Sequence, residues 1–313
     1  MSMNQMPIIS LAQNNADLLG QQLGASFQSY GFAMVVDHGL DLKIVERAWK
    51  LTAQLFARDE QIKRNGFREG GAGARGYTPF RTEIAKGAAH HDLKEFWHIG
   101  RDLPDKSPLR SSMPDNIWPE GIPEFKSVFT ALYAEFDRVG AQILSAVARY
   151  LGLTADWFDP AIADGNSVLR LLHYPPIDGG GDGAIRAGAH EDINLITLLL
   201  GAEEAGLEIL RPDGQWLGVA PPPGGLAVNV GDMLQRLTNH KLPSTTHRVV
   251  NPAGERALNS RYSMPYFLHL RSDFLIETLP ECIDDTHPNR YPHPILADDY
   301  LRQRLIEIGL LKT

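Results

Sequence analysis

Two residues of the types that ligate metals stand two positions apart in the short sequence His190-Glu191-Asp192. The triplet follows a glycine-rich turn and precedes an apolar run at 195–200. In an extended segment, residues two apart point to the same side, so the imidazole of His190 and the carboxylate of Asp192 would face the same ion. Such triplets are common without a metal, so a metal site needs a third ligand from elsewhere in the chain.

His247 is the preferred third ligand. It begins the β-branched segment 247–250, whereas His240 lies in a turn-like polar stretch and is the weaker candidate. Two histidines and one carboxylate on one side of an ion are typical of non-haem Fe(II) centres, which keep positions open for a co-substrate and O₂. The histidines in polar, turn-rich surroundings are expected in solvent: His90, His91, His287 and His293.

Four stretches of the chain share the pattern of one enzyme family. They are the H-x-D triplet followed by the run at 195–199, the segment 207–250 with its Asn229-Val230-Gly231-Asp232 sequence, the R-x-S triplet Arg261-Tyr262-Ser263, and the segment Asp92-Leu93-Lys94-Glu95-Phe96. Together they resemble the isopenicillin N synthase-like branch of the 2-oxoglutarate/Fe(II) dioxygenases over nearly the whole chain. The resemblance implies Fe(II) held by His190, Asp192 and His247, with 2-oxoglutarate and O₂ as co-substrates.

By the same resemblance, Arg261 and Ser263 bind 2-oxoglutarate, and Tyr174 helps to hold it. A guanidinium is a planar, permanently charged fork that suits a carboxylate in a desolvated pocket, and the serine two residues later faces the same way along a strand. Arg256 is the alternative anchor, but it lies in a turn-like region without a serine partner. The implied reaction converts 2-oxoglutarate to succinate and CO₂ and oxidises a small molecule by hydroxylation or desaturation.

Two departures from the family pattern concern the co-substrate pocket. Many relatives carry N-x-Y-P before the H-x-D triplet, whereas this chain reads Leu172-His173-Tyr174-Pro175. Leu172 therefore has no hydrogen-bond donor where the family's asparagine has one. The segment between His247 and Arg261 is longer than is common in the family, and we predict a hairpin loop there, which tolerates insertion at small cost.

The substrate pocket is predicted from two groups of residues. The residues just after the glycine-rich segment carry mixed charge, and we hypothesise that they close over a small polar molecule together with residues on the core strands. The candidates are Tyr77, Phe80, Arg81, Glu83, Arg170, Phe267 and His269. For Tyr77, Phe80, Arg81 and Glu83, exposure to solvent on the surface of a loop is an equally good interpretation.

Two alternative functions stay open. In one, 2-oxoglutarate itself is fragmented to ethylene and succinate while an amino acid assists. In the other, which belongs to a different class, a jelly-roll protein binds a metal without turnover. The complete ligand set, together with Arg261 and Ser263, argues against the second alternative, and release of succinate would separate an enzyme from a binding protein.

Composition limits the partners. The 313 residues carry a formal net charge of −8 with scattered basic residues, so we expect no nucleic-acid partner. The apolar runs are far shorter than the ~20 residues that span a bilayer, so we expect no membrane partner. The N-terminal residues do not resemble a secretory signal, and Cys282 is the only cysteine. A cytoplasmic protein is therefore predicted, with Cys282 in a structural role and the oligomeric state left open.

The elements that must position these residues follow from hydrophobic periodicity. A β-branched run predicts a strand at 32–36, and five glycines predict a loop at 65–76. Apolar residues at helical spacing predict four helices, of which the third is the longest and is expected to brace the core. The helices are 10–30, with Ser10 as its N-cap, 42–56, 123–153 and the closing helix 297–311.

After residue 165, short apolar runs alternate with turns rich in Pro, Gly, Asp and Asn, and no long helix intervenes. Such spacing predicts a sandwich or barrel. The predicted strands are 168–174, 195–200, 207–210, 215–219, 226–230, 246–250 and 261–269.

We therefore predict an α+β protein with a double-stranded β-helix (jelly-roll) core and flanking helices, including the long bracing helix. The expected divisions are an N-terminal helical or mixed region at 1–120, the bracing helix and its connection at 121–165, the Fe(II)/2-oxoglutarate jelly-roll core at 166–275, and a C-terminal extension with a helix at 276–313.

Overall fold

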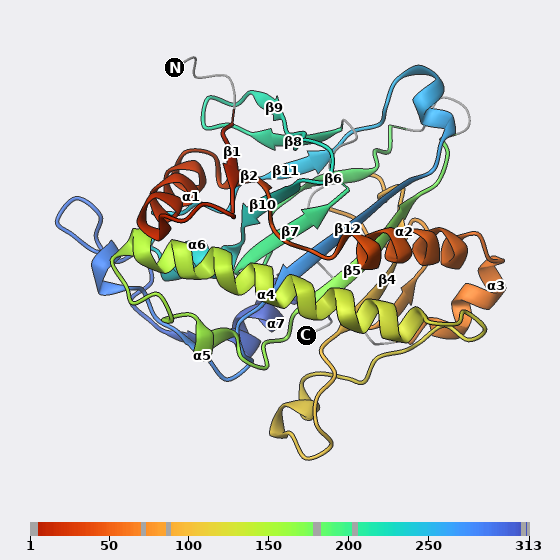
Figure 1. The fold of residues 1–313 in the computed structure, drawn as a ribbon, viewed down its shortest axis with the longest axis horizontal. Helices are drawn as coiled ribbons and strands as arrows, with labels where there is room; N and C mark the ends of the chain where they lie inside the picture. The colour runs from red at the N-terminus through yellow and green to blue at the C-terminus, as the bar shows by residue number, and fades with distance from the viewer. Residues whose placement is uncertain are drawn as a thin grey trace.

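Two β-sheets that share a small apolar core form the centre of the molecule. The computed structural model describes residues 6–69, 73–85, 89–177, 183–201, 206–307 and 311. Within them, the larger sheet has eight strands in the order β1-β2-β10-β7-β12-β5-β4-β3, and the smaller sheet has four in the order β6-β11-β8-β9. Neighbouring strands are antiparallel except β1 and β2. The predicted jelly-roll core is confirmed (Figure 1).

The strand and helix bounds are as follows. The larger sheet contains β1 (Ile8–Ser10), β2 (Phe32–Val36), β3 (Gly76–Thr78), β4 (Glu95–Gly100), β5 (Val168–Tyr174), β7 (Ile196–Leu200), β10 (Leu226–Val230) and β12 (Arg261–Leu268). The smaller sheet contains β6 (Ala187–His190), β8 (Leu207–Leu210), β9 (Trp216–Gly218) and β11 (His247–Val249), and β13 (Leu275–Ile276) pairs with β14 (Ile295–Leu296). The helices are α1 (Ala16–Tyr30), α2 (Leu42–Phe56), α3 (Glu60–Lys63), α4 (Phe125–Leu151), α5 (Asp159–Ile162), α6 (Asp232–Leu237) and α7 (Ala297–Glu307).

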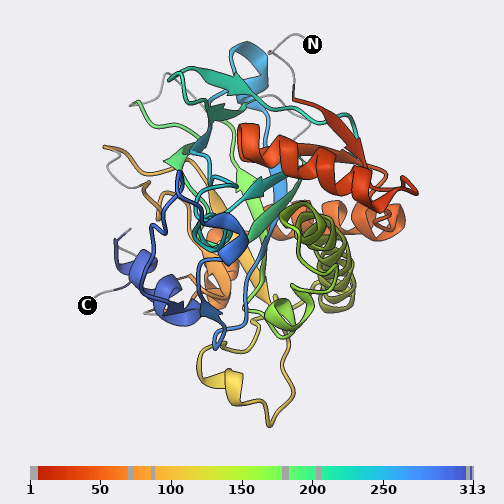
Figure 2. The ribbon, with the colours of Figure 1, turned by 90° about the vertical axis from the view of Figure 1, so that its left-hand side faces the viewer.

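The helices α1, α2 and α4 lie on one side of the larger sheet, and α7 lies on the other side (Figures 1 and 2). The longest, α4, buries one continuous stripe because its apolar residues recur at helical spacing. Gly152 ends it in a left-handed conformation (φ 82°), which glycine adopts without strain. The predicted bracing helix is thus confirmed, and its fully buried residues include Phe129, Leu132, Phe136, Val139, Ile143 and Val147.

The strand β12 shows how one segment serves two layers. Because side chains alternate between the faces of a strand, Tyr266 points to the helical layer, where its ring stacks on Phe136 of α4 with centroids 5.2 Å apart. Its neighbour Phe267 faces the opposite side and lines a cavity. Arg261 and Ser263 share the face of Phe267 by the same alternation. The sheet therefore separates the main apolar core from the space in which chemistry can occur.

The start of the chain differs from its prediction. Ser10 is not a helix N-cap, because it ends the strand β1 and its hydroxyl donates to Oδ2 of Asp37 at 2.6 Å. The helix begins later, at Ala16, where the side chain of Asn15 accepts from two backbone N–H groups. Leu11 fits the helical period of the sequence but is buried just after a strand that pairs with β2.

The predicted hairpin between His247 and Arg261 is wrong. The strand β11 pairs with β6 and β8 in the smaller sheet, whereas β12 pairs with β5 and β7 in the larger sheet. The connection therefore crosses between sheets, and it contains a short 3₁₀ segment at Gly254–Leu258. Connections of this kind join the two sheets of a sandwich. The segments 246–250 and 261–269 therefore follow each other in the sequence without pairing as neighbouring strands.

The expected N-terminal region and the expected core both contribute strands to one sheet. The region 1–120 contributes β1, β2, β3 and β4 to the larger sheet, so it shares one sheet with the expected core 166–275. Residues 70–72 of the predicted glycine loop and 308–310 of the predicted closing helix lie outside the described residues.

Cys282 is buried. No helix in the described part of the chain is long and apolar enough to cross a membrane.

Candidate metal centre

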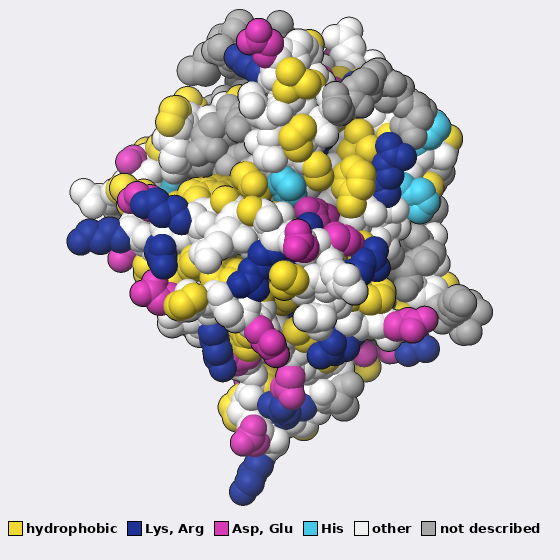
Figure 3. Space-filling model, turned by 90° about the vertical axis from the view of Figure 1, so that its right-hand side faces the viewer, with side chains coloured by type: hydrophobic (Ala, Val, Ile, Leu, Met, Phe, Trp, Pro, Cys, Tyr) yellow, Lys and Arg dark blue, Asp and Glu magenta, His cyan; other side chains and the backbone are white. Residues whose placement is uncertain are grey.

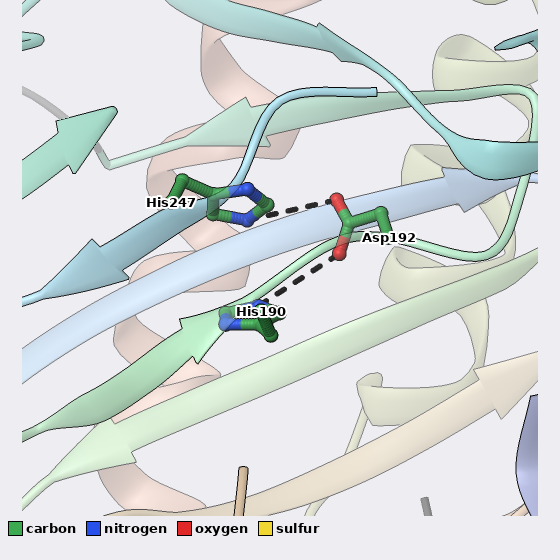
Figure 4. A group of neighbouring side chains, drawn as sticks. All are labelled: His190, Asp192 and His247. Carbon is green, nitrogen blue, oxygen red and sulfur yellow. Dashed lines mark ion pairs between the residues drawn. The ribbon is translucent and has the colours of Figure 1, made fainter. Parts of the chain in front are cut away.

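His190 and His247 face each other across neighbouring strands. They are direct partners in the register of β6 and β11, and their ring centroids lie 4.4 Å apart. Asp192 follows β6 and points between them, with Oδ1 3.9 Å from Nε2 of His190 and Oδ2 3.9 Å from Nε2 of His247 (Figure 4). One ligand atom from each residue lies within 4.8 Å of the other two. The structure thus brings together the three residues predicted to bind a metal.

Backbone carbonyls fix the orientation of both imidazoles. Nδ1 of His190 donates to the carbonyl of Gly188 at 2.7 Å, and Nδ1 of His247 donates to that of Thr245 at 3.1 Å. A carbonyl only accepts, so each ring carries its proton on Nδ1 and presents a lone pair on Nε2. Burial and the nearby His247 lower the pKa of His190 to about 4, which keeps its imidazole neutral and able to bind a cation near pH 7.

Asp192 is held by two side chains that the sequence prediction missed. Its Oδ2 accepts from Oγ1 of Thr197 at 2.6 Å and from Nδ2 of Asn229 at 2.8 Å. Burial alone would raise the pKa of Asp192, but the two imidazoles and these hydrogen bonds lower it below its usual value. Thr197 and Asn229 are direct partners on β7 and β10, so only the strand register shows that they act on the same carboxylate.

The other histidines lie away from this cluster. His240 is exposed and its Nε2 contacts the hydroxyl of Tyr291 at 2.5 Å, so it takes no part in the group of three. Its backbone is left-handed (φ 66°), as expected in a turn. The histidines predicted to be in solvent are exposed: His90, His91, His287 and His293.

The residues expected to hold the co-substrate lie together on β12 and β5. Arg261 is 2% exposed, and its Cζ lies 5.5 Å from the ring centroid of its strand partner Tyr174. Ser263 is also buried and pairs in register with Leu172, which packs against Tyr174. Arg256 is exposed in the 3₁₀ segment, so it does not reach this buried group. Leu172 thus supplies apolar contact where the family's asparagine would donate.

A second buried arginine approaches the same ring. Arg186 is 2% exposed, and its Cζ lies 5.7 Å from the ring centroid of Tyr174. It immediately precedes β6, which carries His190. Two guanidinium groups therefore lie beside one aromatic ring, a geometry in which the ring face attracts the cations.

A cavity of about 450 Å³ opens beside the candidate metal ligands, a size typical of small-molecule sites. His190 and Asp192 border it, and so do four of the predicted substrate residues: Glu83, Arg170, Phe267 and His269. The helix α7 contributes Leu301, Arg304 and Leu305 to its wall.

The other three predicted substrate residues are not part of the cavity wall. Tyr77 is 1% exposed, and its hydroxyl hydrogen-bonds to the carboxylates of Glu60, at 2.6 Å, and Glu95. It lies beside Trp97 on the side of β3 and β4 that faces away from the cavity. Phe80 and Arg81 are exposed at the surface. Side chains alternate between the two faces of β3 and β4, and this alternation explains the position of Tyr77. The sequence prediction did not include it.

Paired charges form one wall of the cavity. Arg170 lies between two aromatic rings, with its Cζ 4.1 Å from the centroid of Phe96 and 5.1 Å from that of Phe267. Its two terminal nitrogens each lie 3.3 Å from a carboxylate oxygen of Glu83, and its Nε donates to Nε2 of His98 at 2.5 Å. Burial alone would raise the pKa of Glu83, but its cationic neighbours lower it well below its usual value.

Lys94 connects this wall to the candidate metal ligand His190 through hydrogen bonds. Its Nζ lies 2.9 Å from Glu83 and 2.7 Å from Asp92, and the other oxygen of Asp92 accepts from the backbone N–H of Gly188 at 2.8 Å. The carbonyl of Gly188 in turn accepts from His190. A chain of hydrogen bonds therefore runs from the cavity wall to His190. On the face shown in Figure 3, acidic and basic side chains are interspersed, without a broad basic area.

Comparisons with known proteins agree with this geometry. Residues 165–270 match the model of the 2OG-Fe(II) oxygenase superfamily, and residues 6–121 match the N-terminal model described as non-haem dioxygenase in morphine synthesis. The chain is 31% identical over 294 residues to a 2-oxoglutarate-Fe(II) type oxidoreductase from Emericella nidulans, and the match covers 91% of this chain and 83% of the relative.

Solved structures show the same fold. A crystal structure assigned to the 2OG-Fe(II) oxygenase family, from Caulobacter crescentus, has 52% sequence identity and a TM-score of 0.92, and the match covers 98% of this chain and all of that one. A full-length protein from Neurospora crassa, crystallised with α-ketoglutarate and thymine, has 28% identity and a TM-score of 0.84, and the match covers 96% of each chain.

Proposed function

The chain belongs to the 2OG-Fe(II) oxygenase superfamily and is an oxidoreductase that uses Fe(II), 2-oxoglutarate and O₂; on this premise we propose that His190, Asp192 and His247 bind its iron. The observation that carries the assignment is the group of three ligand atoms within 4.8 Å of one another. Two neutral imidazoles and one carboxylate make a donor set of intermediate hardness that suits Fe(II), and the protein leaves the remaining positions to small molecules.

The chain's own residues bind and orient the co-substrate. Arg261 binds the distal carboxylate of 2-oxoglutarate, Ser263 donates a hydrogen bond to it, and the ring of Tyr174 packs against it. Bound iron supplies O₂ activation, in which oxidative decarboxylation of 2-oxoglutarate to succinate and CO₂ is coupled to oxidation of a substrate C–H bond. Deep burial of Arg261 strengthens the contact by excluding water.

The prime substrate is a small molecule that enters the cavity beside His190 and Asp192. Glu83, Arg170 and Phe267 form the wall that it meets, and the hydrogen bonds among the charged side chains hold that wall in one arrangement. Because the carboxylates already neutralise Arg170 and Lys94, this wall offers shape and an aromatic surface more than net charge.

Succinate formation tests the proposal. Purified protein is incubated under air with Fe(II) and 2-oxoglutarate, alone and with a panel that contains thymine, small amino acids and small carboxylic acids. Succinate that requires both Fe(II) and 2-oxoglutarate, and that rises with a panel compound, is the expected result. Absence of succinate under every condition, in protein that binds Fe(II), would contradict the proposal. Ethylene in the headspace would show that 2-oxoglutarate itself is fragmented.

A further inference from the structure

One cationic side chain in the cavity wall has no carboxylate partner among the described residues. Arg75 hydrogen-bonds only to the carbonyl of Ala74 at 2.8 Å and to Oδ1 of Asn166 at 3.4 Å, and its Nε has no partner. A guanidinium has five N–H donors, so most of them stay unused. The other described lysine and arginine side chains of the cavity wall each pair with an acid: Lys94, Arg170 and Arg304.

The position of Arg75 is fixed although no described carboxylate forms an ion pair with it, and Asp102 acts on its charge only through space. The residue is 6% exposed, and its guanidinium lies flat against Gly100. A Cβ on Gly100 would lie 1.9 Å from Cζ of Arg75, so any other residue there would displace the guanidinium. Burial lowers the pKa of Arg75, but an arginine still remains charged near pH 7. Burying an unpaired charge is costly, so this position favours a ligand that carries a negative charge.

Two further donors lie next to Arg75. Oδ1 of Asn166 accepts from Arg75, which leaves the amide N–H₂ of Asn166 to donate elsewhere. The backbone N–H of Asn166 donates to the carbonyl of Leu270 at 3.4 Å, which places it beside His269. Nδ1 of His269 is buried without a hydrogen-bond partner. Burial lowers the pKa of His269 to about 4, so its imidazole is neutral and carries one N–H.

We propose that Arg75, Asn166 and His269 form a subsite for a carboxylate of the prime substrate, which is therefore a small organic acid. All three residues line the cavity that His190 and Asp192 border, and the inference rests on the proposed function because it assigns the substrate of that site. A carboxylate accepts several hydrogen bonds in one plane, which matches a guanidinium flanked by an amide and an imidazole. The same contacts would hold one end of the substrate and so orient the rest of it.

The test compares carboxylic acids with the corresponding amides, in which the carboxylate charge is removed. Calorimetric titration without O₂ measures binding of L-proline against L-prolinamide, benzoate against benzamide, and thymine as a neutral ring. We expect at least one acid to bind about 10-fold more tightly than its amide. In Arg75→Met the acid should lose about 10- to 100-fold in affinity, the effect of removing charge-assisted hydrogen bonds, while the amide is unchanged. Arg75→Lys should retain part of the preference.

Controls separate this subsite from the iron centre. Arg271→Met removes a charge close in sequence to His269, on an arginine that pairs with Asp273 outside the cavity, and should leave the acid preference intact. The titrations are run on metal-free protein and on protein loaded with Fe(II) and 2-oxoglutarate. Substrate-independent succinate formation in Arg75→Met, at the wild-type rate, would show that the iron centre is intact. If no acid binds more tightly than its amide, or if Arg75→Met and Arg75→Lys both keep the preference, the subsite is not a carboxylate site.

Discussion

The two ends of β12 carry sites of different construction. At its start, Arg261 lies buried beside Tyr174, its direct partner on the neighbouring strand β5. Past its end, His269 borders a cavity whose wall also comes from residues 73–85, β4, β5 and α7. The first site depends on two neighbouring strands, so a short motif predicts it. The second site is assembled from distant segments, so it is visible only in the folded chain.

The charged groups also differ between the two ends. The first end places Arg261 and Arg186 against the ring of Tyr174. At the second end, Arg170 and Lys94 are bound by the chain's own acids, and Arg75 stays without one among the described residues. We infer that the first end binds the common co-substrate and that the second end distinguishes one substrate from another.

The largest effect is expected at the centre that serves both ends. His247→Ala removes an iron ligand, so turnover should fall by about 1,000-fold or more, whichever substrate is used. The measurement is succinate formation at saturating 2-oxoglutarate. His240→Ala is the matched control and should retain wild-type turnover, because His240 lies at the surface. The reverse result would mean that His240 is the third ligand.

The next effect separates the first end from the second. Arg261→Met should raise the KM for 2-oxoglutarate about 100-fold, since it removes a buried charge-assisted contact with the co-substrate's carboxylate. Affinity for the prime substrate should change little. Arg256→Met is the control and should leave both constants as they are, because Arg256 is exposed. Equal losses for co-substrate and substrate would show that the two ends are not distinct sites.

A smaller effect is expected from the residues that hold Asp192. Asn229→Leu removes one of the two hydrogen bonds to its Oδ2, and loss of such a supporting contact lowers metal affinity about 10-fold or more. The measurement is the dissociation constant for Fe(II) under anaerobic conditions. Asn289→Leu, at an exposed position, should not change it. Unchanged affinity in Asn229→Leu would mean that the carboxylate is positioned by other contacts.

The smallest effect concerns the paired charges of the second end. The lowered pKa of Glu83 means that its contribution to stability is present above its unfolded value of 4.5 and is lost as the pH falls below it. Glu83→Gln should therefore lower the Tm by several degrees at pH 7, and the difference from wild type should shrink at pH 4. Thermal unfolding at both pH values measures this. A difference that grew on acidification would contradict the assigned ion pairs.

Much of the fold and the grouping of His190, Asp192 and His247 could be predicted from the sequence, for identifiable reasons. The period of α4 and the apolar runs of β2, β5, β8 and β10 are local signals, and each element matches its prediction. The R-x-S triplet lies within β12, so its first and third side chains share a face, and Asp192 follows two residues after His190, which ends β6. Local spacing is sufficient in these cases because the geometry that matters is contained within a few residues.

The remaining errors share one cause, which is contact between distant segments. Local pattern did not show that Thr197 and Asn229 meet at Asp192, since they lie on different strands. It also placed Tyr77 at the substrate, although β3 turns that side chain toward Glu95. The predicted hairpin before β12 is wrong because β11 and β12 pair with strands of different sheets. The segment that joins them does not determine this pairing.

We propose that both ends of β12 serve one iron ion, which His190, Asp192 and His247 hold. Anaerobic titration with Fe(II), followed by calorimetry, tests this without any substrate. We predict one tight site per chain in wild type and in His240→Ala, and loss of that site in each of His190→Ala, Asp192→Ala and His247→Ala. A tight site that survives in His247→Ala, in protein with wild-type thermal unfolding, would contradict the assignment.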